Sequence, residues 1–250
     1  MSGIIGYVGH RSCREVLYEG LRRLDYRGYD SADLAWIEEG RANGIRVVGK
    51  LDARGPALDA LLPDTGAEPP RLAGADHLAI GIGHTRWATD GASSERRSNP
   101  HRGPSGRIRI ALDGIIENHI GFHRRVVADT VRCSFETDAE ALAHLLALNY
   151  DGDLAEAVRC SLPDLDGRFA LVAMCEEEPD MLVGIRRECP LVLGVGERER
   201  FIASSTAAFR DYTHDVSALG NDQIAVLHAG DVSVMDGVAR PRRPEASRVG

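Results

Sequence analysis

Lysine is almost missing from this sequence of 250 residues. Lys50 is the only one, and all other lysine-or-arginine positions are arginine. We interpret this imbalance as genomic codon bias, because proteins from extreme thermophiles are instead enriched in lysine and glutamate. Acidic residues outnumber basic ones, which gives a formal net charge of −8. We therefore expect neither nucleic acid nor an anionic membrane as a partner.

Cysteine is also sparse, and its spacing matches no known metal or disulfide framework. The five cysteines are scattered and form no Cys-x-x-Cys pair: Cys13, Cys133, Cys160, Cys175 and Cys189. This pattern predicts reduced thiols in a cytoplasmic protein, without a structural zinc site. The N-terminus lacks the basic and apolar regions of a signal peptide, and no run approaches the roughly 18 apolar residues of a membrane helix.

No cofactor motif is present either. The segment Gly194-Val195-Gly196-Glu197 lacks the third glycine of a dinucleotide-binding loop. With 43% hydrophobic and 27% charged residues, the composition is that of a globular protein. We predict one domain over residues 1–238. Residues 239–250, rich in arginine and proline, are predicted to form a flexible tail.

Hydrophobic patterning predicts short strands in both halves of the chain, separated by helices. Strands are expected at 3–8, 34–37, 45–48, 78–83, 108–112, 169–174, 181–185, 191–195, 201–203, 223–227 and 231–235. Helices are expected at 12–24, with Ser12 as the cap, and at 51–62, 118–129, 138–149 and 153–162. Two strand-rich halves of this kind favour sheets that pack on each other with helices outside.

Five segments carry the strongest functional signal. They are Gly3 to Gly6 (GIIG), Leu21 to Ala32 (LRRLDYRGYDSA), Gly83 to Thr89 (GHTRWAT), Gly114 to His119 (GIIENH) and Glu136 to Glu140 (ETDAE). In this order and spacing they resemble the class II glutamine amidotransferases, and most of all the glutaminase domain of the glutamine–fructose-6-phosphate branch. The resemblance extends from Met1 to about Val234. It implies an α+β fold of the N-terminal-nucleophile hydrolase type, in which two stacked antiparallel sheets lie between helices in four αββα layers.

The resemblance also implies a mechanism. In this family residue 2 becomes the N-terminus once Met1 is removed, and a cysteine there attacks the glutamine carboxamide. Its own α-amine serves as the general base. An asparagine side chain and a glycine N–H bind the oxyanion. An arginine pairs with the substrate's α-carboxylate, and an aspartate accepts from its α-ammonium group.

The residues that would hold an amino acid are present. Arg86 matches the carboxylate-binding arginine and Asp138 the ammonium-binding aspartate; we call this pair the amino-acid clamp. Trp87, Thr89 and Asp90 are assigned to the same substrate-binding segment. The alternative is structural, with Arg86 to Thr89 as a folding turn and Asp138 as a helix N-cap. No metal is assigned, because the histidine spacing matches no metal site.

The catalytic residues are changed. Gly114 matches the oxyanion glycine, but Ser2 replaces the nucleophilic cysteine and Asp113 replaces the oxyanion asparagine. The resemblance indicates four further departures, which are Asp33, Asp90, Asn99 and Ser205. Losing one oxyanion donor typically costs about 2.7–4 kcal/mol in the transition state. A carboxylate would add repulsion, unless a dry pocket keeps it protonated.

We therefore expect a stand-alone relative of class II amidotransferases that has little glutaminase activity and binds an amino-acid-like substrate. Ser2 is either a live nucleophile for amide or ester hydrolysis or acyl transfer, or an inert terminus. Two alternatives stay open: a non-catalytic amino-acid-binding or regulatory partner of a separate synthase or acceptor enzyme, and an ordinary ammonia-supplying amidotransferase. An ionised Asp113 in the pocket would also favour a basic amino acid over glutamine.

Overall fold

The structure is a computed structural model that spans residues 1–250. It describes residues 2–28, 31–38, 40–48, 51, 78–86, 100–121, 137–237, 241–242 and 247–248, and the account below concerns these. None of the helices in these ranges is long and apolar enough to cross a membrane.

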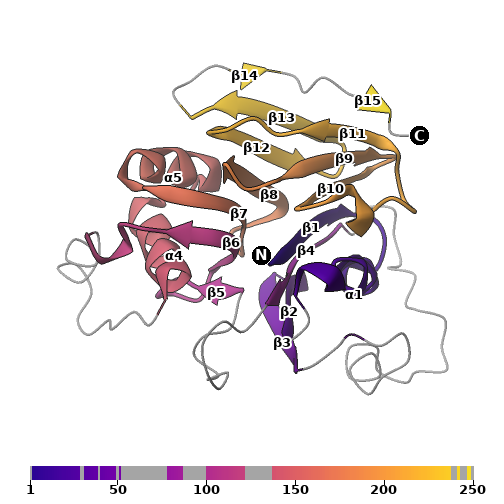
Figure 1. The fold of residues 1–250 in the computed structure, drawn as a ribbon, viewed down its shortest axis with the longest axis horizontal. Coiled ribbons are helices and arrows are strands. Elements are labelled where there is room, and N and C mark those ends of the chain that lie inside the picture. The colour runs from indigo at the N-terminus through magenta and orange to yellow at the C-terminus, as the bar shows by residue number, and fades with distance from the viewer. Residues whose placement is uncertain are drawn as a thin grey trace.

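The first sheet carries the N-terminus near its centre (Figure 1). In spatial order it contains β15 (Ser247–Arg248), β11 (Asp215–Ala218), β9 (Val192–Gly196), β10 (Glu199–Ala203), β1 (Gly3–Gly9), β4 (Ala79–Arg86), β2 (Ser31–Glu38) and β3 (Arg41–Val48). Every pairing in this sheet is antiparallel. Strand β1 therefore joins the N-terminal strands to strands from the last third of the chain.

The second sheet is also antiparallel. In spatial order it contains β14 (Pro241–Arg242), β13 (Asp231–Asp236), β12 (Gln223–His228), β8 (Glu178–Arg187), β7 (Gly167–Cys175), β6 (Ile108–Ile116) and β5 (His101–Arg102). Strand β6 pairs with β7 along its whole length, from Ile108 opposite Cys175 to Ile116 opposite Gly167. This pairing sets the position of the candidate catalytic residues on β6.

Helices cover the outer faces of the two sheets (Figure 1). The α-helices are α1 (Cys13–Arg23), α4 (Asp138–Asn149) and α5 (Leu154–Ser161), and the short 3₁₀ helices are η1 (Asp25–Arg27), η3 (Leu162–Asp164) and η4 (Thr206–Ala208). Helix α1 packs on β1, β4 and β2, whereas α4 and α5 pack on the second sheet. The result is the expected four-layer αββα arrangement.

Three apolar clusters separate the four layers. One lies between α1 and the first sheet, and another lies between the second sheet and helices α4 and α5. The third, which we call the inter-sheet core, joins the facing sides of the sheets through residues such as Ile4, Ile82, Ala111 and Val172. Successive strand residues point to opposite faces. On β6, for example, Ile110 and Leu112 belong to the cluster under α4 and α5, whereas Ala111 belongs to the inter-sheet core.

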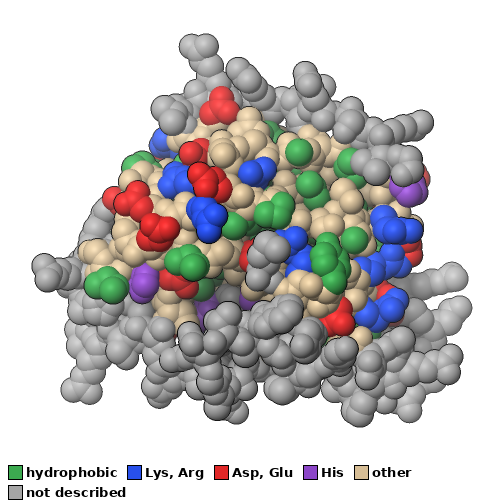
Figure 2. All heavy atoms as spheres, viewed as in Figure 1, with side chains coloured by type: hydrophobic (Ala, Val, Ile, Leu, Met, Phe, Trp, Pro, Cys, Tyr) green, Lys and Arg blue, Asp and Glu red, His purple; other side chains and the backbone are tan. Residues whose placement is uncertain are grey.

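On the face of the molecule in Figure 2, acidic and basic side chains lie among one another. The whole sequence contains 38 acidic and 30 basic residues, so side chains of both signs are expected on its surface. Among the described residues on this face, charges of the two signs are therefore interspersed.

The sequence predicted most described elements, with specific differences. Strand β11 and the two-residue strands β5, β14 and β15 were not predicted, and β6 is longer than expected. Ser12 is the N-cap residue of α1, as predicted, but its side chain makes no capping hydrogen bond. The predicted helix at 51–62 lies outside the described residues apart from Leu51, and so does most of the predicted helix at 118–129. Residues 241–242 and 247–248 pair with β13 and β11, while the flexible tail as a whole stays a prediction.

Candidate active site

The candidate site lies where the inter-sheet core ends. Ser2 directly precedes β1 and is in phase with Ile4, which faces that core. Asp113 on β6 is in phase with Ala111, which faces the same core from the opposite sheet. Strand alternation therefore aims both residues into the same layer from two sides. This explains how positions 111 residues apart come into contact.

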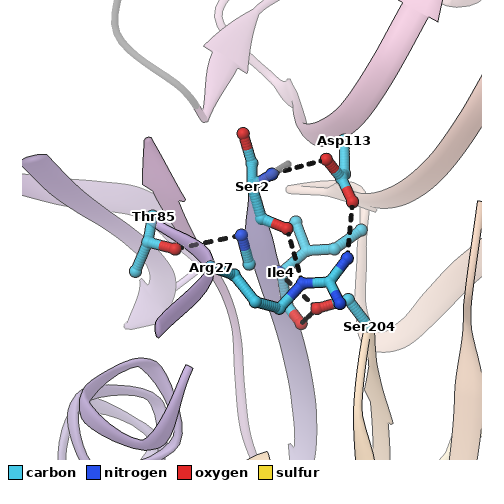
Figure 3. Close-up of polar contacts among 7 residues, drawn as sticks. Ser2, Ile4, Arg27, Thr85, Asp113 and Ser204 are labelled. Atoms are coloured by element: carbon cyan, nitrogen blue, oxygen red, sulfur yellow. Dashed lines mark hydrogen bonds and ion pairs between the residues drawn. The ribbon is translucent and has the colours of Figure 1, made fainter. Parts of the chain in front are cut away.

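Asp113 contacts the backbone of Ser2 directly (Figure 3). The Ser2 N–H donates to Asp113 Oδ1 at 2.7 Å. Asp113 is only 3% exposed, whereas Ser2 is partly exposed, so the hydrogen bond is partly buried. Until Met1 is removed, this nitrogen belongs to a peptide bond; afterwards it is the α-amine that the resemblance assigns as general base. The carboxylate thus lies against the group that would start the reaction.

Arg27 also belongs to this contact, although no sequence pattern predicted a role for it. It is the last residue of η1, which follows helix α1. Its Nε donates to the Ser2 carbonyl at 3.0 Å, and its Nη2 pairs with Asp113 Oδ2 at 3.3 Å (Figure 3). Its side chain is 10% exposed. We call Ser2, Arg27 and Asp113 the N-terminal anchor.

Two further bonds fix the start of β1. The Gly3 N–H donates to Thr85 Oγ1 at 3.0 Å, and the Ile4 N–H donates to Ser204 Oγ at 3.2 Å (Figure 3). A side chain at position 3 could not fit, because its Cβ would lie 2.7 Å from Thr85 Oγ1. Ser2 is therefore held in a defined place by strands from both ends of the chain.

Asp138 lies close to the same end of β6. Its Oδ2 accepts from the Ile116 N–H at 2.9 Å, and its Oδ1 accepts from the Ala139 N–H at 2.9 Å. Thr137, whose Oγ1 accepts from the Glu140 N–H, is the N-cap of α4, so the alternative that made Asp138 the cap is wrong. An ionised carboxylate has about four acceptor sites, so Asp138 retains capacity for a ligand ammonium.

Gly114 follows Asp113 and has a φ of +107°. This left-handed conformation disfavours side chains. A Cβ here would lie 2.1 Å from the Arg168 carbonyl oxygen on β7. Glycine at this position is therefore required by the fold as well as by the expected oxyanion contact.

The other half of the amino-acid clamp is located only by its backbone. Arg86 ends β4, one residue after Thr85, which pairs with Gly3 in the sheet. The backbone of Arg86 thus lies at the same end of the first sheet as Ser2. Trp87, Thr89 and Asp90 lie outside the described residues, as does Asn99. Their assignment to the substrate stays a prediction.

Two of the other residues that depart from the family pattern, Asp33 and Ser205, lie within the described part of the structure. Asp33 on β2 lies directly opposite His84 on β4, and both are almost fully buried. Ser205 caps η4, where its Oγ accepts from the Ala207 N–H at 3.3 Å. Ser205 therefore has a local structural role.

Cys189 adds a thiol to the surroundings of the N-terminal anchor. Burial raises the pKa of this thiol, and the Asp113 carboxylate raises it further, while Arg168, Arg186 and Arg27 oppose the rise. At neutral pH we therefore expect the thiol to be protonated. Across the ranges that the structure describes, no group of three or more His, Cys, Asp or Glu side chains is placed to hold a metal ion.

The geometry argues against the expected preference for basic amino acids. That expectation required the Asp113 carboxylate to face a ligand cation. Instead, Asp113 is buried and pairs with Arg27 of the same chain. Both carboxylate oxygens are already engaged, one by the Ser2 N–H and the other by Arg27, so Asp113 no longer supports that preference.

Comparison with known proteins identifies the family. A family model described as a glutamine amidotransferase domain matches residues 84–211. Glutamine–fructose-6-phosphate aminotransferases of Streptomyces coelicolor and Thermus thermophilus are 43% and 41% identical to the chain, over 94% and 100% of its length. The chain spans only 36% and 39% of these two proteins, less than two fifths of each.

Solved structures match the fold at lower identity. The glutamine phosphoribosylpyrophosphate amidotransferase of B. subtilis has a TM-score of 0.74 at 19% identity, covering 94% of this chain and 49% of that one. A glutamine aminotransferase class-II domain protein from Silicibacter pomeroyi has a TM-score of 0.53 at 11% identity, covering 94% and 98%. Fold, motifs and family model agree: the chain belongs to the class II glutamine amidotransferase family, as a relative of the glutaminase domain of glutamine–fructose-6-phosphate aminotransferase.

Proposed function

We propose that this chain binds an α-amino-acid-like ligand and hydrolyses glutamine at least about a thousandfold more slowly than an intact relative, the scale set by oxyanion-hole losses. One observation carries the proposal. Asp113, which the resemblance assigns to the oxyanion position, is a buried aspartate whose two oxygens contact Ser2 and Arg27. Such a carboxylate repels a developing oxyanion.

The amino-acid clamp supports the binding half of the proposal. Asp138 is held at the end of β6 by the hydrogen bond from the Ile116 N–H, and the Arg86 backbone lies at the same end of the first sheet as Ser2. A guanidinium and a carboxylate at the two ends of a ligand would match the two charges of an α-amino acid. We further propose that any ammonia-consuming or regulatory step is carried by a separate synthase or acceptor enzyme.

Calorimetry with a panel of amino acids tests binding. We expect at least one binder, and we expect Arg86→Ala to weaken it by about 1.5–3 kcal/mol, the scale for a hydrogen bond to a charged group. Arg210→Ala is the matched control, because the Arg210 side chain is 71% exposed and pairs only weakly with Asp211. The methyl ester of the binder should bind poorly, because it lacks the carboxylate.

Two results would contradict the proposal. Equal binding of the amino acid and its ester would show that Arg86 does not bind the ligand carboxylate. Ammonia release from glutamine at the rates of intact relatives would show that Asp113 does not prevent hydrolysis.

A further inference from the structure

The nitrogen atom of Ser2 has an unusual environment for a catalytic α-amine. Its hydrogen-bond acceptor is the buried Asp113 carboxylate at 2.7 Å. Hydrogen bonds between ionised partners are roughly twice as strong as neutral ones. After removal of Met1, an ammonium ion at this nitrogen would gain that strength, whereas a neutral amine would not.

Other charges near this nitrogen oppose or modify the effect. Arg27 on η1 contacts both the Ser2 carbonyl and Asp113. Arg168 on β7 and Arg186 on β8 act on the neighbouring Cys189 together with Asp113 and Arg27. Further groups at this end of the sheets are Asp33 on β2, His84 on β4 and Asp138 on α4.

The direct contact decides the balance. Asp113 Oδ1 contacts the Ser2 nitrogen itself. Arg27 instead contacts the other oxygen of Asp113 and the carbonyl oxygen of Ser2. Since Coulomb attraction weakens with distance, the nearest charge dominates. The nitrogen is thus in an environment that favours the protonated state.

We propose that, once Met1 is removed, Asp113 holds the α-amine of Ser2 as an ammonium ion and so prevents it from acting as the general base. In the family mechanism the lone pair of this nitrogen accepts the proton of the nucleophile. An ammonium ion has no lone pair, so it cannot take the proton of the Ser2 hydroxyl when that oxygen attacks a substrate. Asp113 therefore suppresses catalysis at the base as well as at the oxyanion position.

This inference rests on the proposed function but is measured independently of it. The chain has only two primary amines, its N-terminus and Lys50. An acylating reagent such as acetic anhydride modifies only unprotonated amines. Mass spectrometry of the N-terminal peptide from about pH 6 to about pH 10 therefore gives the midpoint at which the α-amine deprotonates. Lys50 reports on the reagent in the same sample.

For the wild type we expect the N-terminal midpoint to lie about 1–3 pH units above the ordinary value of about 7.7–8.0. Labelling at neutral pH should then be at least about tenfold slower than in the urea-unfolded protein. Asp113→Asn keeps the shape and should return the midpoint to the ordinary range. Arg27→Gln leaves Asp113 without its other cation, so the midpoint should stay raised or rise further.

The opposite behaviour of the two variants separates an electrostatic role from a structural one, because simple loosening of the N-terminus would lower both midpoints. Four results would overturn the proposal: retained Met1 in the intact mass, an ordinary midpoint in the wild type, an unchanged midpoint in Asp113→Asn, or a lowered one in Arg27→Gln. If Asp113→Asn does not fold, the wild type and Arg27→Gln still decide. Rapid glutamine hydrolysis overturns the proposed function, whereas an ordinary midpoint overturns this inference alone.

Discussion

Arg27 and Asp113 form an ion pair between η1 and β6, across 86 residues of sequence. Their side chains are only 10% and 4% exposed. Removing one partner of a buried pair leaves an uncompensated charge, which typically costs about 3–5 kcal/mol. Replacing both partners by apolar residues of similar size is often neutral or stabilising.

We therefore expect Arg27→Met and Asp113→Leu each to lower the free energy of unfolding by about 3–5 kcal/mol, with the double variant closer to the wild type than either single one. Urea unfolding measures all three. The surface pair Arg107–Glu177 is the control: its side chains are 58% and 42% exposed, so its loss should cost at most about 1 kcal/mol. Additive losses in the buried pair would show that the two residues act separately.

Ser2 and Asp113 should also be coupled in catalysis. A cysteine restores the family's nucleophile, and an asparagine restores the oxyanion donor and relieves repulsion. We expect Ser2→Cys with Asp113→Asn to release ammonia from glutamine faster than the product of the two single effects predicts, because such residues act as a unit. A double variant no faster than the better single one would place the defect elsewhere.

The sequence predicted the elements whose signals are local. Helix α4 begins at the predicted residue because Thr137 caps it and a run of alanine and leucine follows. Strand β11, with the sequence Asp-Val-Ser-Ala, is short and mixed in polarity, so it lacks a pattern that periodicity detects. Strand β6 continues past its predicted end because β7 pairs with it through Gly114, a residue that weakens the sequence signal for a strand.

The sequence motifs predicted the residues of the candidate site, but not the hydrogen bonds and the ion pair that join them. Arg27 lies inside one of the quoted motifs, yet nothing local shows that it meets Asp113. The contact depends on two strand registers and on the turn after α1, which are properties of the tertiary fold. One signal was available, because a buried carboxylate that replaces an amide needs a cationic or hydrogen-bonding partner.

Gly114 offers a test of backbone strain at the site. Gly114→Ala would force a side chain into a φ of +107° and place its Cβ 2.1 Å from the Arg168 carbonyl oxygen. Such a conformation typically costs about 1–3 kcal/mol. We expect the free energy of unfolding to fall by more than this, because the backbone of β7 must also move. Gly106→Ala is the matched control, since Gly106 has a φ of +75° with open space around it.

The control should lose only about 1–2 kcal/mol. Thermal unfolding compares the two variants. Equal losses would mean that the backbone of β7 moves at little cost at Gly114, and that the pairing of β6 with β7 is not what requires a glycine at this position.

Asp138 provides the last prediction, because its structural and ligand-binding roles can be separated. Its carboxylate accepts two backbone N–H groups and lies in the first turn of α4, where negative charge is favourable. Asp138→Asn keeps an acceptor oxygen but removes the charge, so stability should fall by only about 0.3–1 kcal/mol. Binding of the amino acid should weaken by about 1.5–3 kcal/mol, because the ligand ammonium loses its anionic partner.

Glu140→Gln is the matched control for this change. Glu140 lies in the same first turn of α4, so removing its charge should affect helix stability to a similar degree. It has no assigned contact with the ligand, so calorimetry should find binding unchanged. Unfolding measurements on both variants separate the helix effect from the binding effect. If both variants weaken binding equally, the charge of the helix turn and not a direct contact with Asp138 governs affinity. Asp138 would then not be part of the amino-acid clamp.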